Sequence, residues 1–430
     1  MAKKKKIVKE DEFDMGDFTS NLIRDLNKEN GDKVAYNLST DVSPTHIKRW
    51  IPTGIKQLDY VCSNRRNGGL PEGRIVEIFG APSIGKSHVA AQICKSVQKM
   101  KGIAVYIDSE TATSVENLQN LGVNVRKGFV YVNEHCTENI LAIAESTILK
   151  ARALTTDIPV VIVWDSVAAS SPKAELEGDY EQQSIGLQAR AISKGMRKIT
   201  GVIADQNVLF VILNQVRVNI GVRYGDPDTT PGGKAIPFHA STRIKLSSGT
   251  AIKNDEGEVI GINVISKTIK NKVAAPFRTV RFQIHFGKGI REHEETYDLL
   301  RKNGPELING KIYQLTGGGS WKSFYVWDAS DEKNREATDE AMKIMSSKKK
   351  ESTPKQEPVV CIINKKFYKS GFDKIINDAE TKVYVEDLME RTFVRIYEAD
   401  PDIDLDSYVE VAAIASELSE GLIDIEEYLK

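Results

Sequence analysis

RIVEIFGAPSIGKS, residues 74–87, joins an apolar strand-like run to a glycine-rich loop that ends in Lys86 and Ser87. Glycines let the backbone curl so that several N–H groups face phosphate oxygens, and the lysine adds positive charge beside them. Ser87 is expected to place its hydroxyl on Mg²⁺, and the dipole of a helix that starts there favours an anion. The pattern predicts a nucleotide-binding phosphate loop. Its residues are Gly80, Ala81, Pro82, Ser83, Ile84, Gly85, Lys86 and Ser87.

Apolar runs alternate with helical stretches after residue 73. Strands are predicted at residues 75–79, 104–107, 160–164 and 208–213, and helices at residues 87–100, 114–120, 137–153 and 185–204. This alternation predicts an α/β fold, in which a parallel sheet carries helices on both faces. Later strands, at residues 242–246, 261–267 and 279–286, have little helix between them. We therefore expect the sheet to continue with antiparallel strands at one side.

Carboxylates follow two of the predicted strands. Asp165 ends the run VVIVWD and is expected to hold Mg²⁺ beside Ser87, although an aspartate after a strand is otherwise a common capping or turn residue. Asp108 and Glu110 end the run YIDSE, and if the strand continues through them, alternation places both on one face, where one of them can orient water for hydrolysis. The spacing does not choose between these two, and the alternative is that both are helix-capping or solvated charges.

Two polar loops leave the same edge of the predicted sheet. The strand at residues 208–213 ends in Asn214 and Gln215, and a glycine-rich stretch, residues 216–233, follows it. A second polar stretch, residues 175–184, follows the Asp165 strand. Ligands of parallel sheets bind at the carboxyl edge, and long loops in compact domains are usually functional. The two loops therefore indicate that the nucleotide state is communicated to a second ligand.

The chain as a whole is nearly neutral: its 430 residues include 59 Lys and Arg against 60 Asp and Glu, a net charge of −1. This excludes a surface coated in positive charge but not nucleic-acid binding, which depends on local charge. The four cysteines form no Cys-x-x-Cys pair, so neither a disulfide framework nor a zinc site is expected. No apolar run approaches the roughly 20 residues of a membrane span, and the lysine-rich start lacks the apolar stretch of a signal peptide. We expect a cytoplasmic protein without a membrane partner.

Composition also divides the chain. Residues 1–50 form a polar arm with an amphipathic stretch at residues 18–26, and the α/β core is expected over residues 51–290. A small α+β region, residues 291–347, precedes a polar linker, KKKESTPKQEP, at residues 348–358. Residues 359–430 form an acidic C-terminal extension, whose part 398–430 carries eleven acidic residues and one basic residue.

Motifs along the core resemble one family, the RecA recombinases of bacteria and phages. The resemblance runs almost without gaps over residues 51–289, and several of its motifs are specific to this family among P-loop ATPases. They are IPTGIKQLDYVC, GGLPEGRIVEIFGAPSIGKS, YIDSE, VIVWDSVAA, PKAELEGD, GLQARAISKGMRKITG, FVILNQVRVNIGVRYGDPDTTPGGKAIPFHAS and KNKVAAPFR. The resemblance implies that the α/β core is a RecA-like P-loop ATPase.

The resemblance implies roles for the residues that match family positions. Besides Lys86, Glu110 is implied as the residue that activates water, and Gln215 as the sensor of the γ-phosphate. Lys270 and Lys272 are implied to reach the ATP of the neighbouring protomer, and Phe238 to lie at the subunit interface. DNA contacts are implied in the loops 177–184 and 216–233 and on the helix after the first loop, at Arg190, Arg197, Arg217, Arg223, Tyr224, Gly232 and Gly233.

The function implied by the resemblance is that of an ATP- and Mg²⁺-dependent recombinase in recombination and repair. It would form a filament of many copies on single-stranded DNA, pair this strand with homologous double-stranded DNA and exchange strands, with DNA-stimulated ATP hydrolysis. Single-strand-binding and loader proteins are implied partners. The acidic tail within this extension, residues 398–427, would compete with DNA for the basic groove or offer partners a charged site. Equally, it would be a solubilising tail or the surface of a small helical domain.

Two other classes of protein share parts of this pattern. A ring-shaped motor on the same core would carry an arginine finger in place of Lys270-Asn271-Lys272. A recombination mediator that binds ATP without hydrolysing it would not need Glu110, Gln215 or both loops. The recombinase is the reading that uses all of these features.

The sequence departs from the family at three places. Where the family has Asp-Pro and an adenine-stacking tyrosine, this chain has Ser114, Val115 and Asn117, so adenine contacts are expected to differ. Glu181-Gln182-Gln183-Ser184 differs from the usual first loop, and beyond residue 317 the resemblance is loose. These departures favour a phage-encoded member.

Overall fold

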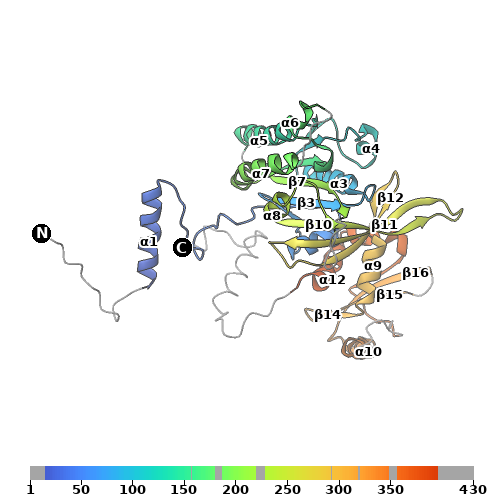
Figure 1. Ribbon diagram of the computed structural model, residues 1–430. Helices are drawn as coiled ribbons and strands as arrows, with labels where there is room; N and C mark the ends of the chain where they lie inside the picture. Colours follow the sequence, from blue (N-terminus) through green and yellow to red (C-terminus); the bar gives the residue numbers. More distant parts are fainter. Residues whose placement is uncertain are drawn as a thin grey trace. The chain divides into compact units, whose positions relative to one another are not determined.

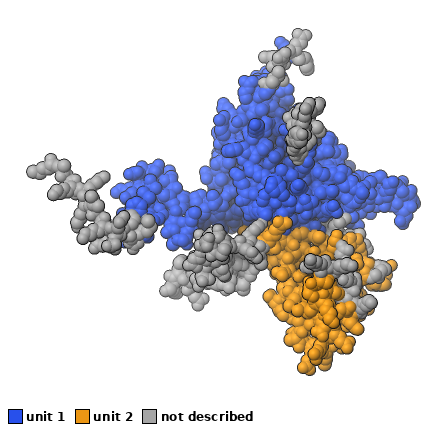
Figure 2. Space-filling model, turned by 60° about the horizontal axis from the view of Figure 1, so that its bottom comes forward, with its two compact units in different colours: residues 1–63, 67–292 blue, residues 64–66, 293–430 orange. Residues whose placement is uncertain are grey.

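The computed structural model describes residues 15–155, 157–179, 186–218, 228–291, 293–317, 320–347 and 356–395. The chain divides into two compact units (Figure 2). Unit 1 comprises Met1–Ser63 and Asn67–Glu292, and unit 2 comprises Asn64–Arg66 and His293–Lys430. None of the helices in the described ranges is long and apolar enough to cross a membrane.

Unit 1 is built on a sheet whose described part has nine strands, in the order β13-β12-β11-β10-β3-β7-β6-β4-β5 (Figure 1). Six consecutive strands of this order are parallel to one another: β10 (Thr242–Lys253), β3 (Ile75–Gly80), β7 (Leu209–Gln215), β6 (Val160–Asp165), β4 (Ile103–Asp108) and β5 (Phe129–Asn133). Antiparallel pairing then adds β11 (Val259–Asn271), β12 (Thr279–His285) and β13 (Gly289–Arg291). The predicted α/β fold, a parallel sheet with antiparallel strands at one side, is confirmed.

Helices cover both faces of this sheet. On one face, α5 (Thr137–Leu154) and α7 (Leu187–Asp205) pack into a core cluster that includes Trp164 and Phe210. On the other face, α3 (Lys86–Lys99) contacts β3, β4, β6 and β7. Neighbouring residues of a strand face opposite sides: Val105 belongs to the α5–α7 cluster, whereas Tyr106 faces α3.

The other described elements of unit 1 are mostly short. The helices are α1 (Met15–Asn30), α2 (Lys56–Ser63), α4 (Val115–Asn120), α6 (Lys173–Leu176) and α8 (Ala235–His239). The amphipathic stretch predicted at residues 18–26 lies within α1. Two small antiparallel pairs complete the unit: β1 (Trp50–Ile51) with β2 (Leu70–Pro71), and β8 (Arg217–Val218) with β9 (Asp228–Thr229).

Unit 2 is an α+β unit with an antiparallel sheet. The sheet contains β14 (Glu306–Ile308), β15 (Lys311–Thr316), β16 (Trp321–Asp328) and β17 (Ile363–Tyr368), in this order. The helices are α9 (His293–Lys302), α10 (Arg335–Ser346), α11 (Phe372–Asn377) and α12 (Lys382–Phe393). Strand β17 follows residues 348–358 in the sequence and pairs with β16, so the sheet includes strands from both sides of the proposed linker. Residues 348–355 and 396–430, with most of the linker and the acidic segment, lie outside the described residues.

Candidate active site and nucleic-acid interface

The phosphate-loop motif lies between β3 and α3, at the carboxyl edge of the parallel strands. Gly85, just before α3, has a φ of 95°, and a Cβ atom there would lie 2.1 Å from Cδ1 of Ile284. A Cβ atom at Gly80 would lie 2.5 Å from the carbonyl oxygen of Leu246. Glycine is therefore required at both positions. The backbone curls in front of the N-terminus of α3, which is an anion-binding geometry.

Lys86 begins α3, and its ammonium group lies over the loop. It donates hydrogen bonds to the carbonyl oxygens of Gly80 at 3.1 Å and Ala81 at 2.8 Å. Burial lowers the pKa of this ammonium group, while the negative charges of Asp165 and Glu110 favour its charged form. The lysine and the two carboxylates thus belong to one electrostatically coupled site.

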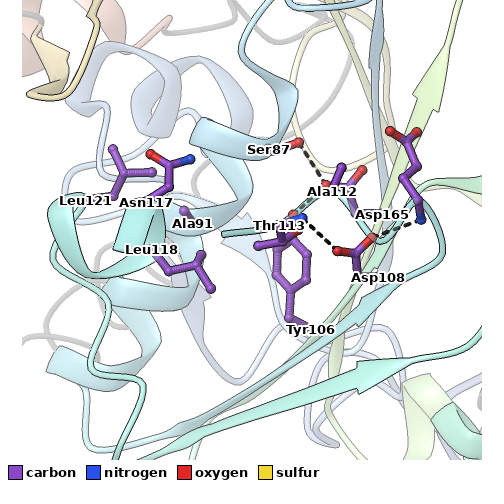
Figure 3. A pocket seen from close by; sticks show the side chains of 11 residues that line it. Ser87, Ala91, Tyr106, Asp108, Ala112, Thr113, Asn117, Leu118, Leu121 and Asp165 are labelled. Carbon is purple, nitrogen blue, oxygen red and sulfur yellow. Dashed lines mark hydrogen bonds between the residues drawn. The ribbon is translucent and has the colours of Figure 1, made fainter. Parts of the chain in front are cut away.

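Ser87 and Asp165 are in direct contact. The Ser87 hydroxyl donates to Oδ2 of Asp165 at 2.8 Å, and the Tyr106 hydroxyl donates to the same oxygen (Figure 3). Burial raises the pKa of the Asp165 carboxyl, although both hydroxyl bonds act to lower it. A serine hydroxyl and a carboxylate are hard oxygen ligands of the kind that Mg²⁺ prefers. The donor set of Ser87 and Asp165 therefore fits a magnesium ion.

Asp108, at the end of β4, stabilises the turn that follows the strand. It is buried and accepts hydrogen bonds from the backbone N–H groups of Glu110 and Thr113, both at 2.9 Å, and from the Tyr131 hydroxyl at 3.0 Å. Burial acts to raise the pKa of the Asp108 carboxyl, but the bonds from Thr113, Tyr131 and the Glu110 backbone outweigh it and lower the pKa. Both carboxylate oxygens of Asp108 therefore accept hydrogen bonds from groups of the surrounding structure.

Glu110 has different surroundings from Asp108. Its side chain is exposed, and Oε1 accepts hydrogen bonds from the Ser166 hydroxyl and from Nε2 of Gln215, the latter at 3.4 Å. Ser166 directly follows Asp165, and the peptide bond between them is cis. Glu110 therefore connects the ends of three neighbouring strands, β4, β6 and β7.

The end of β7 is also connected to the second loop. Asn214 is fully buried, and its amide donates to Oε1 of Glu77 and to the carbonyl oxygen of Pro231, both at 3.0 Å. Glu77 on β3 is fully buried as well and forms an ion pair with Arg243 on β10. Because Pro231 lies near the end of the loop 216–233, this network connects that end to three strands of the core.

The described candidates for DNA binding lie on α7 and at the ends of the second loop. Arg190 and Arg197 on α7 and Arg217 on β8 are exposed. Gly232 and Gly233 have φ values of 92° and 70°, a backbone region that favours glycine. The remaining candidates, Arg223, Tyr224 and residues 180–184 of the first loop, lie outside the described residues.

The candidates for contact between protomers gather around α8. Lys270 donates from Nζ to the carbonyl oxygens of Pro237 at 2.7 Å and Phe238 at 2.9 Å, which are near the C-terminus of this helix. Lys272 is exposed, and the Phe238 side chain is 74% exposed. Lys270 therefore lies against the C-terminal end of α8, next to the exposed Phe238.

The core matches a known family model over most of its length. The model of the RecA N-terminal domain matches residues 19–291. The chain belongs to the RecA family. Protein RecA of Methylococcus capsulatus is 42% identical over 275 residues, which cover 64% of this chain and 73% of that protein. Protein RecA of Syntrophus aciditrophicus is 40% identical over 267 residues, which cover 62% of this chain and 75% of that protein. Protein RecA of Chlamydia felis is 40% identical over 301 residues, which cover 70% of this chain and 80% of that protein.

Membership in the RecA family gives the activity. RecA proteins are DNA-dependent ATPases that act in homologous recombination and repair, and this chain is an ATP-dependent recombinase of that family. It binds nucleotide and DNA and assembles into filaments, as the family does.

A pocket beside Ser87 carries the departure from the usual RecA pattern. Its lining includes Ala91 of α3, Thr113, and Asn117 and Leu118 of α4 (Figure 3). Asn117 stands where the resemblance to RecA implies an aromatic residue that stacks on adenine. The Asn117 side chain is an amide and has no aromatic ring to stack on adenine. Adenine recognition is therefore predicted to differ from that of the family, and this stays a prediction.

Sequence analysis missed two hydroxyl groups that contact the carboxylates of the RecA site, those of Tyr106 and Ser166. It also missed the Tyr131 hydroxyl, which contacts the structural Asp108 outside that site. Tyr106 lies two residues before Asp108, and this spacing, which places both on one face of β4, is a signal available in the sequence. For Ser166, the one signal in the sequence is its position directly after Asp165. Tyr131 becomes a neighbour through the pairing of β5 with β4, which no local pattern specifies.

Proposed function

We propose that the chain hydrolyses ATP at the loop Gly80–Ser87, with Mg²⁺ held by Ser87 and Asp165 and with water oriented by Glu110. The observation that supports this most directly is the position of the Glu110 carboxylate. It accepts hydrogen bonds from Ser166 and Gln215 and lies close enough to Lys86 and Asp165 to affect their pKa values. An exposed carboxylate fixed beside the phosphate loop is suited to orienting a water molecule.

The residues of the site have different proposed roles in phosphoryl transfer. Backbone N–H groups of the loop and the Lys86 ammonium bind phosphate oxygens and stabilise their negative charge. Mg²⁺, when bound, supplies further charge neutralisation. Ser166 and Gln215 both donate to Oε1 of Glu110, and we assign Oε2 to the hydrogen bond with water.

Gln215 has the position required for a sensor of the γ-phosphate. Its amide donates to Glu110, and the residue lies between the buried Asn214 and the second loop. A γ-phosphate that accepts a hydrogen bond from Gln215 changes the contacts at the start of this loop. We propose that ATP binding arranges the loop to grip DNA and that hydrolysis releases it.

DNA binding is assigned to the two loops and to Arg190, Arg197 and Arg217. Arginines contact mainly phosphates, so binding is expected to be independent of sequence. Lys270, Lys272 and Phe238 are assigned to the contact with the next protomer, where the lysines complete its nucleotide site. Filaments on single-stranded DNA then pair with homologous double-stranded DNA. Single-strand-binding and loader proteins are the proposed partners, and the acidic segment 398–430 is a proposed site of competition with DNA.

The test is ATP turnover with and without single-stranded DNA, combined with electron microscopy of the protein with ATP. The wild type is expected to show DNA-stimulated turnover and helical filaments. Glu110→Gln should bind ATP normally but lose at least about 100-fold in turnover, as expected for loss of an acid–base group. Glu256→Gln, in the exposed hairpin between β10 and β11, is the matched control and should behave as wild type. Discrete rings, or turnover unchanged in Glu110→Gln, would contradict the proposal.

A further inference from the structure

Tyr106 is a fully buried tyrosine whose hydroxyl contacts the carboxylate proposed to hold the metal. Its side chain is 0% exposed, and its hydroxyl donates to Oδ2 of Asp165, the oxygen that also accepts the hydrogen bond of Ser87. A hydrogen bond to an ionised acceptor is stronger than one between neutral groups. Two hydroxyl groups from two elements, β4 and α3, therefore fix this one oxygen.

The strand register explains how Tyr106 reaches Asp165. Strands β4 and β6 are parallel, and Asp108 is the register partner of Asp165. Tyr106 lies two residues before Asp108, on the face of the sheet that carries α3, and its ring lines the pocket that also contains Ser87 (Figure 3). The length of a tyrosine side chain brings the hydroxyl to the level of the strand ends. A phenylalanine at this position would fill the same space and leave Oδ2 with the hydroxyl of Ser87.

We infer that Tyr106 is a positioning residue, which orients the Asp165 carboxylate for Mg²⁺ and sets the Mg²⁺ concentration at which the protein binds nucleotide tightly. This inference rests on the proposed metal role of Ser87 and Asp165. Groups that hydrogen-bond to a metal ligand hold it in the required orientation, and their loss typically costs 10–100-fold in metal affinity. The alternative is that the hydroxyl only satisfies hydrogen bonding in the core.

The test compares Tyr106→Phe with the wild type in the binding of a fluorescent ATP analogue over a series of Mg²⁺ concentrations and in EDTA. We expect the half-saturating Mg²⁺ concentration to rise by about 10-fold or more, with unchanged binding in EDTA. Tyr131→Phe is the matched control, because it removes a tyrosine hydroxyl from a neighbouring carboxylate, Asp108. It should leave the half-saturating Mg²⁺ concentration at the wild-type value.

A second pair of variants tests whether Tyr106 acts through Asp165. In an Asp165→Asn background, Tyr106→Phe should produce no further change in Mg²⁺ dependence. An unchanged half-saturating Mg²⁺ concentration in Tyr106→Phe, alongside normal Mg²⁺ dependence of the wild type, overturns this inference alone. Nucleotide binding by the wild type that does not depend on Mg²⁺ overturns the proposed metal site and the inference with it. An equal loss of nucleotide binding in EDTA and in Mg²⁺ shows a merely structural role and also overturns it.

Discussion

The buried ion pair between Glu77 and Arg243 allows a quantitative prediction. Glu77 is fully buried on β3, and the Arg243 side chain on β10 is 16% exposed. The Arg243 guanidinium also lies 4.7 Å from the centre of the Phe79 ring. Removing one partner of a buried pair leaves an uncompensated charge, at a cost of about 3–5 kcal/mol in the free energy of unfolding.

The different burial of the two partners predicts which single variant is worse. Glu77→Met leaves the arginine with partial access to water and with the Phe79 ring, so we expect the low end of the range, about 3 kcal/mol. Arg243→Met leaves a fully buried carboxylate whose remaining partner among the described residues is the Asn214 amide, so we expect the high end, about 5 kcal/mol. The double variant removes both charges and should cost less than about 2 kcal/mol, mainly the acceptor lost by Asn214.

The assay is unfolding in denaturant, monitored by hydrogen exchange in peptides from β3 and β10. These peptides report the unfolding of unit 1 separately from that of unit 2. A double-mutant cycle then gives the coupling between the residues. The reasoning from burial would be refuted if the costs of the two single variants added up in the double variant. It would also be refuted by a loss below about 1 kcal/mol in Glu77→Met, or by a larger loss in Glu77→Met than in Arg243→Met.

Three further predictions concern other parts of unit 1. Lys270→Ala should lower DNA-stimulated ATP turnover at least about 10-fold, measured in a turnover assay. It should cost less than about 1 kcal/mol in the free energy of unfolding, measured by thermal unfolding, because it removes one cation that lies at the C-terminus of α8. Gly232→Ala forces an L residue to a φ of 92° and places a Cβ 2.9 Å from Ile192, so it should weaken single-stranded DNA binding in fluorescence anisotropy. Burial raises the pKa of the Glu72 carboxyl from 4.5 to about 7 despite two nearby arginines. The folded state thus favours protonated Glu72, so wild-type stability should fall as pH rises from 4.5 through 7, and Glu72→Gln should lose this part of the fall in urea unfolding at several pH values.

The sequence predicted the central strands to within about two residues because both faces of these strands are covered by helices. Strands β3, β4, β6 and β7 are almost fully buried, so their sequences are nearly continuous apolar runs. Strand β5 (FVYVN) was missed because it is a partly exposed edge strand, without such a run. Composition predicts an extension over residues 359–430, and nothing local in the sequence indicates that residues 363–368 form β17 and pair with β16.

The candidate site was predictable in its motifs but not in its contacts. The phosphate loop and Asp165 follow from residue types and spacing alone. The different surroundings of Asp108 and Glu110 do not, because one donor to Asp108, Tyr131, lies 23 residues away in the sequence. Pairing of β4 with β5 brings this hydroxyl to Asp108, and pairing through β6 and β7 brings Gln215 to Glu110. Only the order of strands in the sheet determines these neighbours.

The same strand order provides a route for the proposed effect of nucleotide on the second loop. The start of this loop is fixed to the phosphate loop, because the backbone N–H of Val216 donates to the carbonyl oxygen of Gly80 at 3.2 Å. Its end is fixed through the bond from Asn214 to Pro231. Gln215, between these two anchors, donates to Glu110 instead. In the proposed mechanism, a phosphate that displaces Gln215 would therefore act on a short backbone segment. The residues on either side of Gln215 in this segment, Asn214 and Val216, are bonded to the end of the loop and to Gly80.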